Sequence, residues 1–324
     1  MTSVQTPTPP SKHHSQLGTY LGLSGALLGM VLLFGYLSEY FFSAETFLAI
    51  ANEFPALLVM AVGMTYVLII GGIDLSVGSV LALSAAATAN AILQWHWGTL
   101  PAGALGLAVG LACGGATGWI AVTWRLPTFI VSLGMLEAVR GGAYVLTDSR
   151  TQYVGDAMGG LAAPWIAGVS SAFFLSMVIV AVAHVVLTRT VFGRYVVGIG
   201  TNEEAMRLAG INPNPIRVAV FAATGVLAGL AGLMQSARLE AADPNSGTGI
   251  ELQVIAAVVI GGTSLMGGRG SVINTLFGVL IITVLEAGLA QIGVSDPSKR
   301  IITGCVIVAA VILDTLRQRR MHVA

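Results

Sequence analysis

Few residues of this chain are suited to catalysis. A nucleotide-hydrolysing P-loop requires Gly-x-x-x-x-Gly-Lys-Ser/Thr, because the lysine must reach the phosphates. The sequence contains two lysines, Lys12 and Lys299, and neither lies in a glycine-rich loop. No pair of histidines has helical ligand spacing beside carboxylates, and no serine–histidine or paired-aspartate set stands out. The sequence therefore predicts a chain that is not an enzyme by itself, with no catalytic residues, no metal site and no ATPase site.

Glu137 and Arg140 are ionisable residues inside an otherwise apolar run. A lone charge at the centre of a bilayer costs about 2.5–3.5 kcal/mol on insertion scales. The spacing i, i+3 places both side chains on one helix face, close enough to pair. Two interpretations stay open: a polar or gating element of a translocation pathway, or a buried pair that ties this helix to a neighbour.

Single polar side chains also interrupt other apolar runs. The candidates for lining the pathway of a polar solute are Asn90, Gln94, Gln235, Asn274, Glu286 and Gln291. Hydrogen bonding between helices explains each of them equally well. A train of acidic residues at mid-membrane, expected of a proton- or sodium-driven carrier, is missing from the sequence.

The segment 189–217 is the longest well-charged stretch of the chain. Asn202 is suited to cap a helix whose first turn holds Glu203 and Glu204, favourably placed against the helix dipole. That helix should stop at Gly210, with Pro213 and Pro215 beyond. A short capped helix between two spans indicates a docking element for a partner outside the bilayer. The alternative is an ordinary solvated loop. The docking hypothesis assigns coupling roles to Arg194, Asn202, Glu203, Glu204, Ala205, Arg207 and Gly210.

These residues must be positioned by membrane helices. The chain has 324 residues, of which 55% are hydrophobic and 9% charged. Soluble domains carry about 25% charge, so lipid must be the main solvent. The 41 glycines are scattered through apolar runs, as in membrane helices that pack closely. The net charge of zero gives no reason to expect a nucleic-acid partner.

We expect an all-α polytopic bundle of about ten transmembrane helices. The charge-free runs predict spans at about 17–38, 54–73, 128–146, 169–188, 218–237, 252–266, 271–290 and 301–313, with two more between 75 and 124 that break at 95–98. Residues 1–16 are predicted to be a disordered tail. Residues 17–316 form one transmembrane domain with its cytoplasmic loop at 189–217, and residues 317–324 are a second tail.

Basic residues in short loops indicate the cytoplasmic side. With ten spans, ten lysines and arginines fall on one side and four on the other. This asymmetry places both termini and the segment 189–217 in the cytoplasm.

A short motif occurs twice, which suggests a duplicated unit. Gly71-Gly72-x-x-Leu75 recurs as Gly261-Gly262-x-x-Leu265, and Gly78-Ser79-Val80 recurs as Gly270-Ser271-Val272. Both copies lie between two predicted spans. In the first copy, Asp74 is expected to cap the following helix. Coincidence in a glycine-rich chain is the alternative.

Four stretches of the sequence resemble permease subunits of bacterial ABC importers, specifically the ribose-type sugar family. They include Gly72-Ile73-Asp74-Leu75-Ser76-Val77-Gly78-Ser79, Gly193-Arg194-Tyr195 with Leu208-Ala209-Gly210, Ala237-Arg238-Leu239, and Gly261-Gly262-Thr263-Ser264-Leu265. Importers of the wider class share a cytoplasmic Glu-Ala-Ala-x-x-x-Gly loop that docks the ATPase. Glu204-Ala205-Met206 with Gly210 keeps that spacing, with Met206 at the second alanine position.

The resemblance implies a multi-pass protein of the bacterial inner membrane that forms the pathway for a monosaccharide such as a ribose-like pentose. It implies three partners: a cytoplasmic ATP-binding cassette subunit that holds ATP and magnesium, a periplasmic sugar-binding protein, and a second copy of this permease or a related one. This chain itself is expected to bind no cofactor. The binding protein would press on the loops 147–167 and 237–250. The alternative function is an autonomous secondary carrier or channel for a small polar solute.

Overall fold

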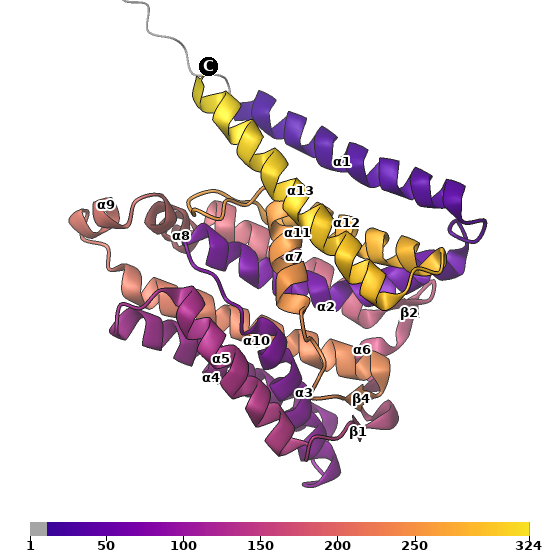
Figure 1. Cartoon of the computed structure of the whole chain (residues 1–324). Coiled ribbons are helices and arrows are strands. Elements are labelled where there is room, and N and C mark those ends of the chain that lie inside the picture. Colours follow the sequence, from indigo (N-terminus) through magenta and orange to yellow (C-terminus); the bar gives the residue numbers. More distant parts are fainter. Residues whose placement is uncertain (1–11, 324) are drawn as a thin grey trace, which may run out of the picture.

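The computed structural model describes residues 12–323, which are mainly helical (Figure 1). The longer helices are α1 (Lys12–Leu37), α2 (Ala44–Ile69), α3 (Val77–Leu93), α4 (Thr99–Thr123), α5 (Thr128–Leu146), α7 (Ser171–Arg189), α10 (Pro213–Leu239), α12 (Val272–Gln291) and α13 (Asp296–Val323). The shorter ones are η1 (Gly155–Met158), α6 (Gly159–Ala162), α8 (Val191–Thr201), α9 (Glu203–Leu208) and α11 (Ile250–Ile260). Two small antiparallel pairs join β1 (Gln152–Tyr153) to β4 (Ala241–Ala242) and β2 (Pro164–Ile166) to β3 (Val169–Ser170).

Seven helices of the described residues are long and apolar enough to cross a membrane. They are α1, α2, α4, α5, α7, α10 and α12, while α3 and α11 are apolar but shorter. The expectation of an all-α polytopic membrane protein is therefore confirmed. The span predicted at 128–146 coincides with α5, and the one predicted at 301–313 falls within α13.

Several predicted boundaries are wrong, and local interactions explain two of them. Helix α2 begins at Ala44 because Ser43 accepts the backbone N–H of Thr46 and so caps a turn that precedes the charge-free run. Helix α11 ends at Ile260, since Gly262 adopts a left-handed conformation that stops it.

Both predicted tails are partly helical. Helix α1 already includes residues 12–16, and α13 continues to Val323. Residues 1–11 and 324 of these tails lie outside the described residues.

Helix α10 runs through the centre of the bundle and packs most closely on α4. Gly110 and Gly114 of α4 face Gly225 of α10, and a Cβ on any of the three would overlap backbone atoms of the other helix. Small residues spaced by four let two helix backbones approach closely, which is a common packing mode in membranes. The scattered glycines of the sequence therefore form helix–helix contacts in this part of the fold.

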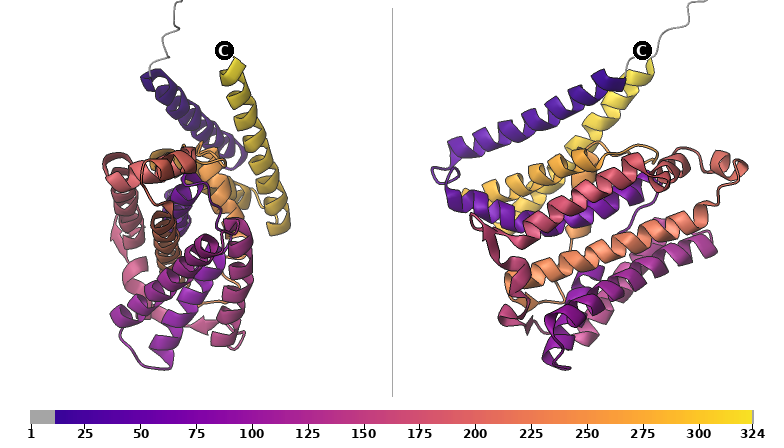
Figure 2. Two further views of the ribbon diagram at one scale, coloured as in Figure 1. Left: turned by 90° about the vertical axis from the view of Figure 1, so that its left-hand side faces the viewer. Right: turned by 180° about the vertical axis from the view of Figure 1, so that it is seen from behind.

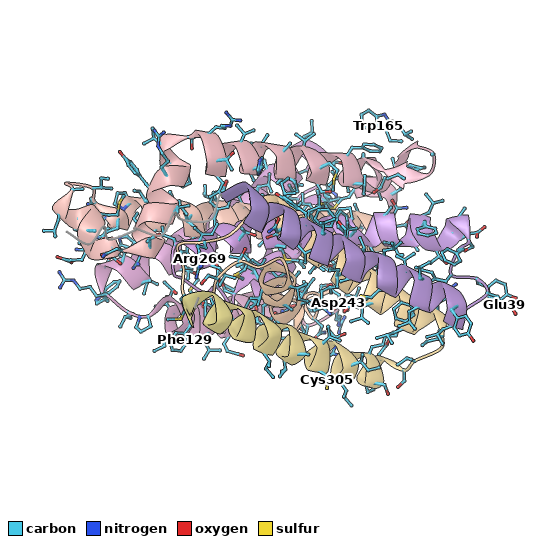
Figure 3. All side chains as sticks on the ribbon, turned by 90° about the horizontal axis from the view of Figure 1, so that it is seen from above. Glu39, Phe129, Trp165, Asp243, Arg269 and Cys305 are labelled. Carbon is cyan, nitrogen blue, oxygen red and sulfur yellow. The ribbon has the colours of Figure 1, made fainter. Side chains whose placement is uncertain are left out.

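The bundle has two distinct ends. Helices α8 and α9 project at one end, and the strand pairs with α6 lie at the other (Figures 1 and 2). Helices α1 and α13 form an outer layer beside α12, and α1 exposes Leu21, Leu28 and Leu32 by 66%, 59% and 57%. Carbon-rich side chains also stand out along the sides of the molecule, while Glu39 lies in the loop after α1 (Figure 3). These sides suit contact with lipid.

Candidate functional site

The polar segment 189–217 is more ordered than the predicted loop. It consists of α8, α9 and the first turn of α10. Pro213 and Pro215 lie beyond α9, as predicted. Pro213 also begins α10, where a proline loses no hydrogen bond, and Asn212 caps that helix by accepting the N–H of Asn214. Only residues 209–212 separate α9 from α10, so α9 is tied closely to a membrane helix.

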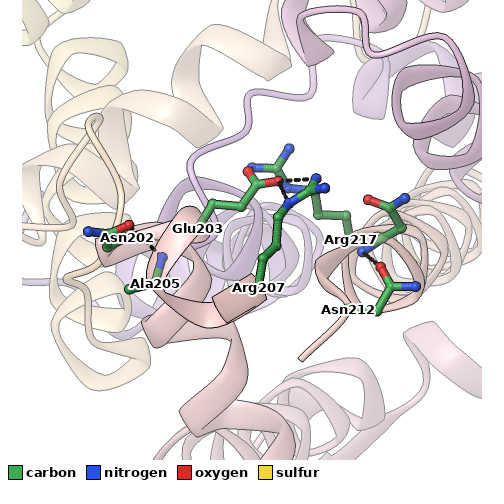
Figure 4. Close-up of polar contacts among 7 residues, drawn as sticks. Asn202, Glu203, Ala205, Arg207, Asn212 and Arg217 are labelled. Atoms are coloured by element: carbon green, nitrogen blue, oxygen red, sulfur yellow. Dashed lines mark hydrogen bonds and ion pairs between the residues drawn. The ribbon is translucent and has the colours of Figure 1, made fainter. Parts of the chain in front are cut away.

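Both ends of α9 are capped as the sequence predicts, and Figure 4 shows the cap at the N-terminal end. Asn202 Oδ1 accepts the N–H of Ala205 at 2.9 Å. At the other end Gly210 has a φ of +81°, and its N–H bonds to the carbonyl of Arg207 while the N–H of Ile211 bonds to that of Met206. This double pattern is a Schellman motif, which favours glycine at the left-handed position. Helix α9 is thus a well-defined single unit of six residues.

Glu203 connects α9 to α10. Its carboxylate lies 2.7 Å from Arg207 Nη2 and 2.6 Å from Arg217 Nη2 on α10 (Figure 4). These side chains are about one-third to one-half exposed, so each pair contributes at most about 1 kcal/mol. The contact with Arg217 nevertheless fixes the direction in which α9 leaves the bundle. Glu204 and Arg194 are exposed and face away from the core.

Helix α8 packs on two turns of the membrane bundle through backbone contacts that sequence reasoning missed. A Cβ on Gly200 would overlap the carbonyl oxygen of Ile69, at the end of α2. That carbonyl also accepts the N–H of Gly268 at 2.8 Å, and Gly267 approaches Gly71. Three segments far apart in sequence therefore meet without side chains between them. The glycines were visible in the sequence, but their partners were not.

The repeated glycine motif has a structural counterpart. Helices α2 and α11 both end in a Schellman motif, with Gly71 and Gly262 at φ of +80° and +83°. The equivalent of Gly71 is therefore Gly262, one position later than the sequence comparison suggested. The second repeated motif has no structural counterpart, because Gly78 lies inside α3 whereas Gly270 precedes α12.

The residues around the end of α11 are closely packed. Gly261 packs against the Asn274 backbone, and Thr263 and Ser264 are buried. Ser264 Oγ accepts the N–H of Met266.

The extended segment between α2 and α3 is held by polar groups. Asp74 is not the cap residue, because α3 starts after Ser76. The Asp74 carboxylate instead accepts both the N–H and the Oγ–H of Ser76, at 2.9 and 2.6 Å.

Helix α5 also bonds to this segment. Thr128 Oγ1 accepts the N–H of Ile73, and Ser132 Oγ accepts the N–H of Leu75, both at 3.0 Å. Irregular backbone within a membrane requires such partners. Gly72 permits close contact with a ring on α10.

Glu137 and Arg140 do not form an ion pair with each other in residues 12–323. Arg140 Nη1 donates to the carbonyls of Pro244 at 2.6 Å and Ser246 at 2.7 Å, so it ties α5 to the loop after β4. Glu137 is exposed on the outer surface of α5, between Gly134 and Gly141, which have open space beside them. A carboxylate in the middle of a membrane helix is unsuited to lipid, so this face needs water or another protein chain.

Of the other predicted pathway residues, Gln235 and Glu286 line one cavity, whereas Asn90 and Asn274 lie outside it. Asn90 donates to the carbonyl of Leu146 at 3.0 Å and so joins α3 to α5. Gln235 lines a cavity near the end of α10. Asn274 lies in the first turn of α12, and its buried Oδ1 has no hydrogen-bond partner within the described part of the chain.

Comparison with known proteins decides the family. Residues 46–311 match the family described as branched-chain amino acid transport system / permease component. The chain belongs to this permease family. It is 40% identical over 298 residues to the ribose import permease protein RbsC of Escherichia coli strain K12, which covers 90% of this permease and 92% of the relative. To the RbsC of Bacillus subtilis strain 168 it is 36% identical, with 92% of each chain covered.

A relative with another named substrate also matches. The permease is 32% identical to the fructose import permease protein FrcC of Rhizobium meliloti, over 85% of this chain and 79% of that one. No solved structure matches the permease. The family and the apolar helices show a transport component that crosses the inner membrane several times.

Proposed function

We propose that this permease forms the translocation pathway of an ABC importer for a monosaccharide such as ribose or a related sugar. The names of its relatives support a sugar as solute. A separate cytoplasmic subunit supplies ATP hydrolysis and holds ATP and magnesium, and this chain binds no cofactor. A periplasmic binding protein delivers the sugar.

In this proposal the chain crosses the membrane about ten times, with both termini and α8–α9 in the cytoplasm. The core of residues 17–316 is one transmembrane domain. The shorter helices α3 and α11 then act as partial or tilted spans next to irregular segments, an arrangement that membrane proteins tolerate where the backbone is buried in protein.

The observation that carries the proposal is the contact of α8 with the turn after α2. The ATPase docks on α9 and the exposed side of α8, through residues such as Glu204 and Arg194. Because Gly200 touches the backbone of Ile69 directly, a displacement of α8 pushes on the end of α2. From there the extended segment is bonded to Thr128 and Ser132 of α5. Motion of the docking helix is thereby coupled to the helix that carries Glu137.

In this proposal the second permease subunit binds the exposed face of α5. Gly134, Glu137 and Gly141 share this face, and the glycines allow a second helix to approach. Between the two subunits Glu137 faces a hydrated pathway, which removes the cost of exposing its carboxylate to lipid.

In this proposal the binding protein docks on the opposite end of the molecule. The two loops expected to receive it are joined there, since β1 pairs with β4 and Val154 donates to the carbonyl of Glu240. Pressure on one loop therefore reaches the other, and through Arg140 it reaches α5.

Reconstitution in proteoliposomes tests this function. Vesicles that contain the permease with its ATPase and binding protein should accumulate labelled sugar only when ATP and magnesium are present on the cytoplasmic side. Vesicles that contain the permease alone should not. Uphill accumulation by the permease alone, driven by an ion gradient, would establish the secondary-carrier alternative instead.

A further inference from the structure

A polar cavity of about 270 Å³ lies inside the single chain, between α2, α10, α11 and α12. Its polar lining includes Glu53, Gln235, Arg238, Gln253 and Glu286. A more open hollow of about 540 Å³ shares Glu53, Gln253 and Glu286 with it and leads outward to α13. The two hollows therefore form one recess with an inner and an outer part.

The recess lies far from the docking helix. Glu53 precedes Ile69 by 16 residues on α2, which is about 24 Å along a helix axis. Ile69 marks the end that contacts α8. A bilayer core is about 30 Å thick, so in the proposed topology the recess opens near the extracytoplasmic surface, where a solute would arrive.

The lining offers both donors and acceptors that are not fully used. Gln253 Nε2 donates to Glu286 Oε1 at 2.6 Å, which leaves the second oxygen of Glu286 and the amide oxygen of Gln253 available. Arg238 Nη2 is 3.8 Å from Glu53 Oε1, too far for a direct hydrogen bond. No side-chain hydrogen bond of Gln235 occurs among residues 12–323. A hydroxyl group both donates and accepts, so several hydroxyls on one small molecule match this mixture.

Acidic and basic side chains both line the recess. Glu53, Glu286 and Asp296 oppose Arg238, Lys299 and Arg300 around the two hollows. Lys299 Nζ donates to Asp296 at 2.9 Å, and this bond holds the pKa of the Asp296 carboxyl below its ordinary value. A neutral ligand suits such a wall better than an anion or a cation, because an ion of either sign would meet side chains of its own sign.

The size limits the ligand to one small unit. A volume of 270 Å³ corresponds to about nine water molecules at roughly 30 Å³ each and lies at the lower end of ordinary ligand pockets. One monosaccharide fits the inner part of the recess, which by itself is too small for an oligosaccharide. The described lining contains no aromatic side chain, so binding should be weak, as a site on a transport route requires.

We propose that this recess is a binding site for one neutral, polyhydroxylated small molecule of monosaccharide size, held within a single permease subunit before it passes to the pathway between subunits. This site rests on the proposed import function, and it adds a resting place for the solute that does not require the second subunit.

Equilibrium binding to the purified full-length permease in nanodiscs tests the site. The probes are labelled ribose, arabinose and fructose, with labelled leucine as a neutral ligand of different chemistry. We expect saturable, weak binding of at least one sugar and no binding of leucine.

A variant of Gln235 tests the wall of the recess. Gln235→Leu removes a donor and an acceptor from this wall and should weaken sugar binding about tenfold or more. The matched control is Gln94→Leu. Gln94 was also a pathway candidate by sequence, but it is exposed at the end of α3 and outside both hollows, so this variant should leave binding within twofold.

A second variant distinguishes a loss of the binding site from a loss of folding. Glu286→Gln keeps the size of the side chain and a partner for Gln253, and it should weaken sugar binding at least threefold while the elution volume and melting temperature stay unchanged. The site is overturned if no sugar binds, if leucine binds equally well, or if both cavity variants bind sugar as the wild type does. ATP-driven uptake by the assembled importer is measured separately from sugar binding. If both variants bind sugar as the wild type does and uptake is normal, the recess is not the binding site, but the import function is supported.

Discussion

The two ends of the bundle are built from different contacts. At the α8–α9 end, backbone meets backbone through Gly200, Gly267 and Gly268, and little space remains between the segments. At the opposite end, side chains meet across a cavity, as in the loose pair of Arg238 with Glu53. Close backbone packing transmits displacement, because protein interiors are dense and compress little. A polar recess is instead suited to hold a solute. In the proposed importer, this difference gives force transmission to one end and solute handling to the other.

The largest effect is expected from filling the glycine contact of α8. Gly200→Ala places a methyl group against the carbonyl of Ile69, and backbone cannot move aside as a side chain can. Such overpacking costs about 1–3 kcal/mol, and it separates α8 from the turn after α2. ATP-driven uptake in proteoliposomes should fall at least tenfold.

Gly198→Ala is the matched control for that variant. It lies on the same helix, but its new methyl group would meet the flexible side chain of Met206. Uptake should stay within about twofold of the wild type. Equal losses in the two variants would show that α8 tolerates no added volume anywhere, and the contact with Ile69 would lose its special role.

A smaller effect is expected from charge reversal on α9. Glu203→Arg places a third positive charge beside Arg207 and Arg217 and releases α9 from α10. We expect sugar-stimulated ATPase activity of the assembled complex to fall about fivefold, with normal amounts of permease in the membrane. Glu203→Arg combined with Arg217→Glu should recover part of the activity.

A variant of the neighbouring residue Glu204 tests whether α9 docks the ATPase directly. Glu204 makes no ion pair within 12–323, so Glu204→Gln tests docking and leaves the Asn202 cap and the Glu203 ion pairs of α9 in place. Reduced affinity for the ATPase in Glu204→Gln, with unchanged helix content, is the result that supports docking through this face. Unaltered affinity in Glu204→Gln and in Arg194→Gln would argue against it.

A third prediction concerns the connection between the ends. Ser132→Ala removes the acceptor of the Leu75 N–H and leaves a partly buried donor without a partner, at a cost of about 1–3 kcal/mol. We expect the melting temperature to fall by several degrees and uptake to fall two- to threefold. Ser176→Ala serves as the control, because Ser176 Oγ–H only donates to the Phe173 carbonyl in its own helix.

The smallest effect is expected at the opposite end. Arg140→Gln shortens the side chain that holds the carbonyls of Pro244 and Ser246. The loop after β4 should become more sensitive to added protease in right-side-out vesicles, while uptake falls less than twofold at saturating binding protein. An unchanged cleavage rate would mean that Arg140 does not restrain the loop.

The sequence predicted features of this fold that depend on neighbouring residues, but it did not predict contacts between residues far apart in the chain. The bounds of α5, the Asn202 cap and the Gly210 stop all depend on neighbouring residues, and they were predicted from hydropathy and capping preferences. The pairing of Glu137 with Arg140 was wrong, because the partners of Arg140 are carbonyls more than a hundred residues away in the sequence.

The contacts that carry the proposed mechanism could not be read from one sequence. Gly200 was one of 41 glycines, and nothing local indicates that it faces Ile69. The recess likewise gathers Glu53, Gln235 and Glu286 from three helices. Periodicity places a residue on a face of its helix, but the neighbour of that face is decided by how the helices assemble.

The central claim is that α9, α8 and the turns near Ile69 and Gly268 move as one body when the ATPase closes. Spin labels at Glu204→Cys and Met266→Cys, in a chain with Cys113 and Cys305 replaced by alanine, measure this movement within one subunit; Met266 is 88% exposed and suited to labelling. A third label at Tyr153→Cys, on β1, reports the opposite end. The account predicts that the distance between labels 204 and 266 is the same with and without bound ATP, while the distance between 204 and 153 changes. A changed distance between 204 and 266 with a constant distance between 204 and 153 would contradict it.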